Sequence, residues 1–232
     1  MEQSYNNEDA LVLTSGGQDS TTSLFWAIKN FKKIYAISFN YGQKHSKEIE
    51  VAQATCKKLN IDHKMVDISF LKELVISNLF EGTDDVNKKH ELNKDVPSSF
   101  VPYRNMIFIT LASAWASTLD VKHIVTGVCE TDYSGYADCR DVFIKSVQTT
   151  LNLATDFKDR NVVIHTPLMW LTKAEEFKFA EELGCLDFII NETLTCYNAD
   201  ETMNDFGKGC NDCPACRLRR NGYEEYLRKY VK

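Results

Sequence analysis

Residues 10–22 read Ala-Leu-Val-Leu-Thr-Ser-Gly-Gly-Gln-Asp-Ser-Thr-Thr, an apolar run that gives way to two glycines and then to hydroxylated side chains. The run 10–14 predicts a buried strand, and apolar side chains recurring at helical spacing over 23–31 predict that a helix follows. The glycine pair lets the backbone turn sharply, and the free N–H groups and positive dipole end of the helix favour an anion. The stretch therefore predicts a phosphate-binding loop after the first strand of an α/β fold.

The glycine spacing separates this loop from two common nucleotide-binding motifs. No Gly-Lys-Ser/Thr follows, as a Walker loop requires, and the spaced glycines of the dinucleotide fingerprint are absent from the sequence. A glycine pair alone is also typical of an ordinary capped turn. Hydroxyl groups at Ser15, Ser20 and Thr21 add hydrogen-bond donors for phosphate oxygens, which favours the phosphate-binding interpretation.

Short apolar runs alternate with helix-period segments along the rest of the chain. Five strands are expected, at 10–14, 34–39, 64–68, 123–128 and 162–166. This alternation predicts a doubly wound parallel five-stranded sheet with helices on both faces. Ligands of such sheets bind beyond the carboxyl ends of the strands, where the strand order reverses. The polar segment 80–99 interrupts the pattern and is expected to be a long loop, either a lid or a solvated insertion.

Composition and charge exclude several classes of protein. The chain has 232 residues, of which 44% are hydrophobic, and its 27 Lys and Arg against 33 Asp and Glu give a net charge of −6. Such a composition is typical of a folded domain, and the charge disfavours a protein that binds nucleic acid through phosphate contacts. The N-terminal residues lack the pattern of a signal peptide, and the longest apolar stretch, 106–119, is too short and too polar for a membrane span. We therefore expect a cytoplasmic protein with no membrane partner.

Four of the eight cysteines lie close together near the end of the sequence. They are Cys196, Cys210, Cys213 and Cys216, and their spacing allows four thiolates to surround one ion. Because disulfides are rare in a reducing compartment, metal ligation is the expected role, and tetrahedral four-sulfur coordination is typical of structural zinc. Free buried thiols and an iron–sulfur cluster are the alternatives, since such clusters also take four cysteines.

A polar loop after the fourth expected strand, residues 127–141, carries further candidate binding residues. Asp132, Asp138 and Arg140 suit a planar heterocycle that bears both N–H donors and a carboxylate. A carboxylate side chain accepts hydrogen bonds from a guanine-type edge, and an arginine binds a carboxylate in bidentate fashion. A surface loop with incidental charges is the alternative.

The loop Ser-Gly-Gly-x-Asp-Ser-x-Thr resembles the pyrophosphate-binding loop of the ATP pyrophosphatases. This resemblance implies the adenine nucleotide alpha hydrolase-like fold and cleavage of ATP to AMP and pyrophosphate. It also implies that Mg²⁺ accompanies ATP, with Asp19 as the nearest carboxylate. The resemblance places Asp19 and Ser20 in catalytic roles and the following residues at ATP: Thr14, Ser15, Gly16, Gly17, Gln18, Asp19, Ser20, Thr21, Thr22, Ser23 and Leu24.

Motifs between residues 12 and 220 together resemble the 7-cyano-7-deazaguanine synthase family of the queuosine pathway. They are the phosphate loop, Asn40-Tyr-Gly-Gln43, Val101-Pro-Tyr-Arg-Asn105, Asp132-Tyr-Ser-Gly-Tyr-Ala-Asp-Cys-Arg140, Thr166-Pro-Leu168 and the four cysteines. Tyr103 and Ala137 depart from the family pattern, which usually has a small residue and a proline there. Neither departure removes a ligand group, so they affect the expected loop shape only.

This resemblance implies a ligase that forms a carbon–nitrogen bond. Its substrates are 7-carboxy-7-deazaguanine, ammonia and ATP, and adenylated acid and amide intermediates lead to the nitrile. The expected substrate-binding residues are Arg104, Asn105, Asp132, Asp138 and Arg140. Residues 1–194 are expected to form the ATP pyrophosphatase-type domain, and residues 195–232 a zinc knuckle with a C-terminal helix and one structural zinc ion.

Two other classes of function share some of these features. A tRNA-modifying ligase, which performs thiolation or forms lysidine, would carry the same loop but needs a basic RNA surface. A non-catalytic zinc-knuckle adaptor would keep the loop without using it. We expect small-molecule substrates and no nucleic-acid partner. The tyrosines near the C-terminus suit a homodimer interface, the state that we expect, although they also suit a helix packed within one chain.

Overall fold

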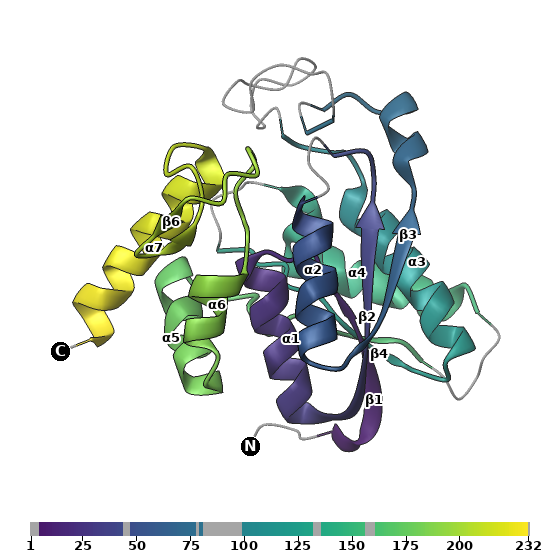
Figure 1. Cartoon of the computed structure of the whole chain (residues 1–232). Helices are drawn as coiled ribbons and strands as arrows, with labels where there is room; N and C mark the ends of the chain where they lie inside the picture. Colours follow the sequence, from purple (N-terminus) through teal and green to yellow (C-terminus); the bar gives the residue numbers. More distant parts are fainter. Residues whose placement is uncertain are drawn as a thin grey trace.

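The computed structural model describes residues 5–43, 47–77, 79–80, 99–131, 136–155 and 161–231. Its main sheet has five parallel strands in the order β3-β2-β1-β4-β5 (Figure 1). The strands are β1 (Tyr5–Leu13), β2 (Phe31–Asn40), β3 (Asp62–Asp67), β4 (His123–Val125) and β5 (Val163–His165). The chain builds outward from β1 to β3 and then returns to β4 on the other side of β1. The strand order therefore reverses between β1 and β4, and the predicted doubly wound parallel sheet is confirmed.

Helices cover both faces of this sheet. Helices α1 (Gln18–Asn30) and α2 (Lys47–Lys58) lie on one face, and α3 (Arg104–Thr118) and α4 (Asp141–Leu153) on the other (Figure 1). Two short 3₁₀ helices, η1 (Ser69–Glu73) and η2 (Ala137–Cys139), precede α3 and α4, respectively. Beyond α1 lie α5 (Lys173–Leu183) and α6 (Leu186–Glu192), and α7 (Pro214–Tyr230) packs along α5.

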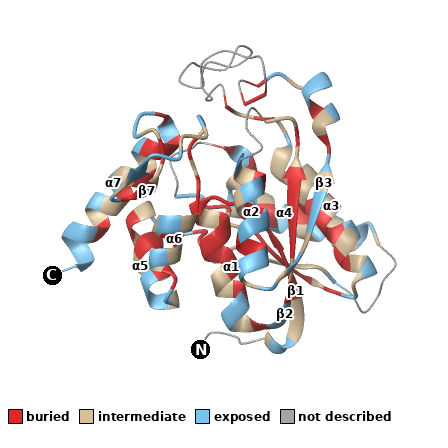
Figure 2. Cartoon of the chain, viewed as in Figure 1, coloured by how far each residue is buried: buried red, intermediate tan, exposed pale blue. Residues whose placement is uncertain are grey.

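The side-chain alternation of β1 explains this layering. Leu11 and Leu13 pack with apolar residues of α3 and α4, whereas Ala10 and Val12 pack with Leu24 of α1. Neighbouring residues of a strand point to opposite faces, so a strand that is apolar at every position is buried on both sides. Burial is accordingly concentrated in the central strands and in the helix faces that cover them (Figure 2).

The element boundaries differ from the expected ones at the ends. Helix α1 begins at Gln18, five residues before the expected helix, and it ends at Asn30 because Phe31 already pairs with Tyr5 in the sheet. Strand β4 ends at Val125, although Thr126 N still donates to His165 O over 3.0 Å. Gly127 then passes so close to the phosphate loop that a Cβ atom there would lie 2.8 Å from the carbonyl carbon of Asp19. Residues 81–98, the core of the predicted long loop, lie outside the described residues.

The C-terminal segment combines a two-stranded ribbon, β6 (Met203–Asn204) and β7 (Gly207–Lys208), with α7. Tyr226 is buried against Phe177 of α5, and the Tyr223 ring lies 5.2 Å from the same phenylalanine ring. These tyrosines therefore pack within the chain, and the homodimer stays a prediction. Among the described residues, no helix is long and apolar enough to cross a membrane.

Candidate functional site

The phosphate loop connects β1 to α1 at the point where the strand order reverses. Gly16 has φ +83°, and a Cβ atom there would lie 2.3 Å from the carbonyl oxygen of Glu48, so only glycine fits. The Ser15 and Ser20 hydroxyls lie 3.1 Å apart, and Ser20 Oγ donates to Gly17 O over 3.2 Å. Gly17, the residue that precedes α1, supplies no side-chain cap to the helix. The loop is thus braced internally, while the helix end is open to an anion.

The predicted ATP-binding residues divide into two groups. Six of them line a cavity of about 300 Å³ beyond the carboxyl ends of the strands: Thr14, Ser15, Gly17, Gln18, Asp19 and Ser20. The other five do not line it: Gly16, Thr21, Thr22, Ser23 and Leu24. Leu24 packs in the core, and Thr22 Oγ1 donates to Gln18 O over 2.9 Å. These five support the loop and the first turns of α1 from behind.

Asp19 takes part in a charge network that the sequence analysis missed. Lys173 Nζ lies 2.8 Å from Asp19 Oδ1 and 2.8 Å from Glu176 Oε2. Lys173 begins α5, which a capping box between Thr172 and Glu175 holds in place. The only sequence signal was the position of this lysine shortly after Thr166-Pro-Leu168. The network places an ammonium group directly beside the phosphate loop.

Residues near the end of the chain hold the loop from the other side. Leu194 N donates to Gly16 O over 3.0 Å, and Gln18 N donates to Thr195 Oγ1 over 3.1 Å. Thr195 Oγ1 also accepts from Arg219 of α7 over 3.3 Å, and the Arg219 guanidinium donates to Ile189 O over 2.8 Å. Burial lowers the pKa of Arg219 to about 10, so this buried guanidinium stays charged near neutral pH. The C-terminal segment is therefore part of the phosphate site.

Aromatic side chains and Arg104 form the far wall of the cavity. Arg104 begins α3, and its guanidinium lies 5.9 Å from the centres of both the Tyr41 and the Tyr136 rings. Burial opposes the charge of Arg104, but Tyr41, Tyr136 and Asp138 outweigh it and hold its pKa above the ordinary value. The Phe108 ring lies 5.5 Å from that of Tyr41. A flat ligand with an anionic group suits this wall.

The other predicted substrate residues lie in different surroundings. Asn105 lines the cavity, but its backbone N–H donates to Asp138 Oδ2 over 3.0 Å, so Asp138 caps the start of α3. Asp138 itself is buried and does not line the cavity. Arg140 is exposed before α4 and does not line the cavity either. Asp132 lies outside the described residues. Arg104 and Asn105 are therefore the two of the five that the structure places in the cavity wall.

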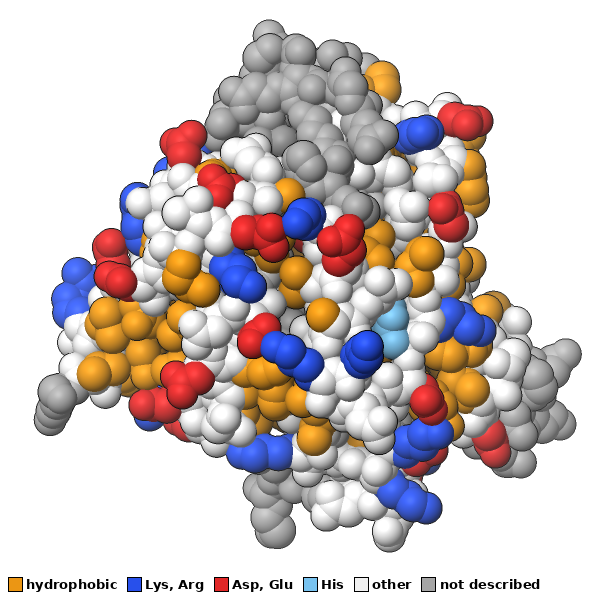
Figure 3. Space-filling view, in the orientation of Figure 1, with side chains coloured by type: hydrophobic (Ala, Val, Ile, Leu, Met, Phe, Trp, Pro, Cys, Tyr) orange, Lys and Arg blue, Asp and Glu red, His pale blue; other side chains and the backbone are white. Residues whose placement is uncertain are grey.

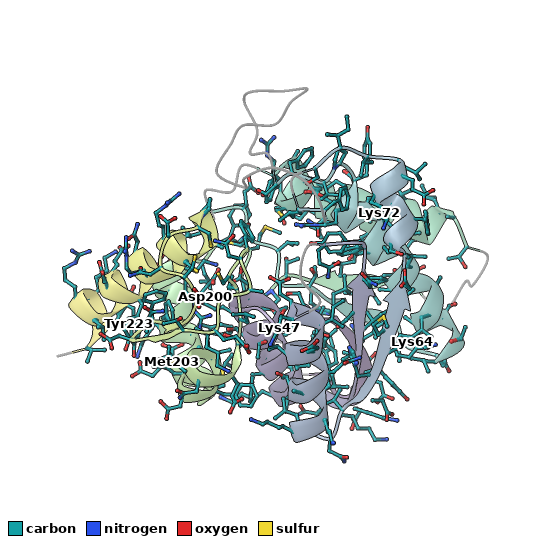
Figure 4. All side chains as sticks on the ribbon, turned by 45° about the horizontal axis from the view of Figure 1, so that its top comes forward. Lys47, Lys64, Lys72, Asp200, Met203 and Tyr223 are labelled. Carbon is teal, nitrogen blue, oxygen red and sulfur yellow. The ribbon has the colours of Figure 1, made fainter. Side chains whose placement is uncertain are left out.

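Glu48 is a cavity residue that the sequence analysis missed. It lies in the first turn of α2, whose neighbouring Lys47 points toward the segment that carries Asp200 (Figure 4). Lys47 Nζ pairs with Glu201 Oε2 at 2.8 Å and so joins α2 to the C-terminal segment. Burial raises the pKa of Glu48 to about 7, and the charge of Arg104 opposes this rise.

The four predicted metal ligands come together as expected. The sulfur atoms of Cys196, Cys210, Cys213 and Cys216 all lie within 4.8 Å of one another, and the Cys210 and Cys216 sulfurs are 3.9 Å apart. Tetrahedral coordination with zinc–sulfur bonds of about 2.3 Å requires sulfur–sulfur distances of roughly 3.8 Å. Cys213 N donates to Cys210 Sγ over 3.3 Å, and Gly209, at φ +157°, leaves no room for a Cβ atom beside Cys216. The cluster can therefore hold one metal ion, and Cys196 also lines the cavity.

Comparison with known proteins relates nearly the whole chain to one family. A family model described as "Queuosine biosynthesis protein QueC" matches residues 9–227. The chain is 49% identical over 229 residues to the 7-cyano-7-deazaguanine synthase of Clostridium novyi. This match covers 99% of this chain and 100% of that protein. It is 51% identical over 222 residues to the synthase of the same name from Phocaeicola vulgatus, covering 96% of each.

A solved structure with a similar fold is a 4-thiouridine synthetase in complex with RNA and ATP. The TM-score is 0.51 at 15% identity, and the match covers 96% of this chain and 54% of that one. At this identity the likeness concerns the fold alone. It agrees with the doubly wound parallel sheet that the sequence predicts.

Proposed function

The chain belongs to the QueC family of queuosine biosynthesis proteins, and on that premise we propose that it makes 7-cyano-7-deazaguanine from 7-carboxy-7-deazaguanine, ammonia and ATP. The observation that carries the proposal is the identity of about half of all positions with two synthases over nearly their full lengths. The placement of the phosphate loop and Arg104 in one cavity supports it.

The chemistry requires two activations of the same carbon. A carboxylate resists ammonia because its oxygen is a poor leaving group, so ATP first transfers AMP to that oxygen and releases pyrophosphate. Ammonia then displaces AMP and gives the amide. A second ATP adenylates the amide oxygen, and loss of AMP and a proton leaves the nitrile. Both substrate oxygens therefore depart on AMP, which makes the reaction that of a carbon–nitrogen ligase.

In this proposal the chain acts by positioning and by charge neutralisation. The loop residues Ser15 to Ser20 and the start of α1 hold the phosphates, and Lys173 balances negative charge beside Asp19. Asp19 is the nearest carboxylate for the Mg²⁺ that accompanies ATP. Arg104 binds the substrate carboxylate, because its guanidinium faces the cavity and is held by two aromatic rings.

We also propose that the four cysteines hold one structural zinc ion. Four thiolates close the coordination sphere, so the metal would stabilise the fold of the C-terminal segment and leave no position for a substrate. The ion would fix Cys196 and, through the adjacent Thr195, the hydrogen bond that supports Gln18 N. Residues 195–232 in this view form a zinc-binding tail on the ATP pyrophosphatase-type domain of residues 1–194.

Thiolation of tRNA receives less support from the structure. Burial raises the pKa of Cys56 to about 11 and that of Cys185 to about 12, so neither thiol is a ready nucleophile. The face drawn in Figure 3 shows Lys and Arg interspersed with Asp and Glu, not a basic surface. We therefore propose small molecules as the substrates.

Isotope tracing tests the reaction. The protein is incubated with ATP, ¹⁵N-ammonium and 7-carboxy-7-deazaguanine that carries ¹⁸O in its carboxylate, and the products are analysed by mass spectrometry. We expect a nitrile with one ¹⁵N and two AMP molecules per nitrile, each with one ¹⁸O. An incubation without ATP is the control. Formation of ADP in place of AMP, or ATP consumption without nitrile, would contradict the proposal.

A further inference from the structure

Glu48 lines the cavity at the start of α2. Among the described residues, no hydrogen bond or ion pair reaches its carboxylate, although Glu48 and Arg104 line the same cavity. The charge of Arg104 attracts the Glu48 carboxylate. Glu48 is half-buried, so its carboxylate can accept hydrogen bonds from a ligand that enters the cavity and supplies donors.

The position of Glu48 is fixed by contacts on both sides. Its carbonyl oxygen packs against Gly16 of the phosphate loop, and the adjacent Ile49 is buried. On the other side, the Lys47–Glu201 ion pair joins the same turn of α2 to the C-terminal segment. Pre-organisation of this kind favours specific recognition, because the protein loses little conformational entropy when the ligand binds.

A carboxylate is an acceptor only, and its two oxygens suit two parallel donors. The edge of a guanine-type ring presents such a pair in its ring N1–H and its 2-amino group. The carboxylate at the opposite side of 7-carboxy-7-deazaguanine would be repelled by Glu48 and attracted by Arg104. The two opposite charges of the cavity thus suit the two ends of one planar substrate, and Tyr41 and Phe108 add aromatic surface to the same cavity.

We infer that Glu48 determines substrate specificity by accepting hydrogen bonds from the N1–H and 2-amino groups of the deazaguanine ring. This inference rests on the proposed function. The sequence analysis assigned such a role to Asp132 and Asp138, but the Asp138 carboxylate is engaged by the backbone of Asn105. Asp19 and Glu48 are the acidic residues among the described residues that line the cavity, and Asp19 is paired with Lys173, which leaves Glu48 for the ring edge.

Pairing a protein variant with a substrate variant tests the inference. We compare 7-carboxy-7-deazaguanine with its 2-deamino analogue, 7-carboxy-7-deazahypoxanthine, in the natural protein and in Glu48→Gln. The natural protein should prefer the 2-amino substrate by at least 10-fold in kcat/KM, because a hydrogen bond to a charged group is worth roughly 10- to 100-fold. Glu48→Gln should lower kcat/KM for the 2-amino substrate by about the same factor and change that of the analogue much less. The preference should therefore collapse.

Glu50→Gln is the matched control, since Glu50 lies on the same helix but is exposed. It should keep the full preference. Calorimetry of both purines without ATP gives a second readout that does not depend on turnover. Glu48→Asp, which keeps the charge but shortens the side chain, replaces Glu48→Gln if the latter fails to fold, and it too should reduce the preference.

Other roles of Glu48 give different results, each of which would overturn the inference. An equal loss of kcat/KM with both compounds would indicate a structural role. A raised KM for ammonia with an unchanged preference would indicate a general base. A raised KM for ATP or Mg²⁺ would indicate a metal ligand. If the natural protein forms no nitrile from either purine but the calorimetric preference still depends on Glu48, the proposed function fails while the recognition stands. If the nitrile forms and the preference is the same in both proteins, only the inference fails.

Discussion

Asp19 is an acidic residue at a site that we propose for the negatively charged triphosphate of ATP. Its neighbours explain how such a residue can lie there. Its carboxylate is paired with Lys173, whose ammonium is also held by Glu176. The pair brings a cation beside the phosphate loop, and the second Asp19 oxygen suits the Mg²⁺ that we propose with ATP. Side chains around a polyphosphate act mainly through such positioning and charge balance.

The first prediction concerns this residue. Asp19→Ala should abolish pyrophosphate release while the fold is kept, since the buried Lys173 side chain retains its ion pair with Glu176. Ser20→Ala should act in the same direction, because Ser20 Oγ braces the loop at Ser15 and Gly17. A coupled pyrophosphate assay and urea unfolding measure the two effects. The exposed Glu182→Ala is the control, and near-normal turnover in either loop variant would show that the phosphate-loop assignment is wrong.

Single residues of the site were predictable from the sequence where the chemistry is local. The glycine pair and the hydroxyls of the phosphate loop lie within a few residues of one another, so their spacing alone indicates an anion site. Lys173 lies 154 residues from Asp19, and Thr195 lies 177 residues from Gln18. Such contacts depend on how helices pack around the sheet, which no local pattern encodes. Asp138 shows the converse: its residue type suited a ligand, but packing assigned it to the start of α3.

At the scale of elements, β4 and β5 share a pair of neighbouring histidines, of which His123 is buried and His165 is half-buried. His123 Nδ1 and His165 Nε2 lie 2.8 Å apart, and His123 Nε2 lies 2.8 Å from Glu8 of β1. The rings of Tyr5, Trp26 and Phe31 surround His165 at 5.1 to 5.6 Å. Burial, and then the neighbouring His123, lowers the pKa of His165 to about 4. The pair is therefore neutral where the sheet is intact.

This pair predicts a loss of stability in mild acid. Because the pKa of His165 is lower in the folded than in the unfolded chain, protons bind the unfolded chain first as the pH falls below 6.5. The contribution of neutral His165 to the free energy of unfolding is therefore complete above pH 6.5 and is lost progressively toward pH 4. Between pH 7 and pH 5 the natural protein should lose about 1 kcal/mol more than His165→Gln, after a discount for partial exposure. Urea unfolding at both pH values measures it, and equal losses in the two proteins would contradict the assignment.

Element types were easier to predict than element ends. The apolar runs of β1 and β2 are strong local signals, and both strands overlap the expected stretches 10–14 and 34–39. The start of α1 at Gln18 was missed because its first turn is polar. Most of those polar side chains are buried, and the backbone N–H of Gln18 donates to Thr195 Oγ1 of a distant segment. Periodicity reports apolar faces only, so it places a helix end late where the first turn serves a binding site.

The whole molecule joins a well-packed sheet to a C-terminal segment with a small core. The apolar cluster around the four cysteines consists mainly of the cysteines themselves, with Leu194 and Ala215. Burial of so little apolar surface cannot order the segment, whereas metal binding at such sites supplies on the order of 10 kcal/mol or more. We therefore expect elemental analysis to find about one zinc ion per chain.

Removal of the metal should affect the C-terminal segment and the five-stranded sheet differently. Chelation or Cys213→Ser should expose the segment around Arg217–Arg220 to protease while the five-stranded sheet stays folded. ATP binding should weaken as well, since Thr195 and Arg219 support the loop. Limited proteolysis, circular dichroism and nucleotide titration measure these effects. Cys56→Ala, which removes a buried thiol outside the cluster, should keep the metal. Iron with visible absorbance, or fully active protein without metal, would overturn the assignment.

The architecture also sets the order in which the protein can mature during translation. The phosphate loop is synthesised well before its partners Leu194, Thr195 and Arg219, which follow it by about 180 to 200 residues. At about 5 to 20 residues per second, residues 195–231 need roughly 2 to 7 seconds after the last sheet strand has long been made. During that interval the nascent chain carries a sheet whose nucleotide loop has no support from behind. A chain cut short before residue 194 would therefore carry the sheet without a supported phosphate loop, and the site can be assembled only after Arg219 has been made.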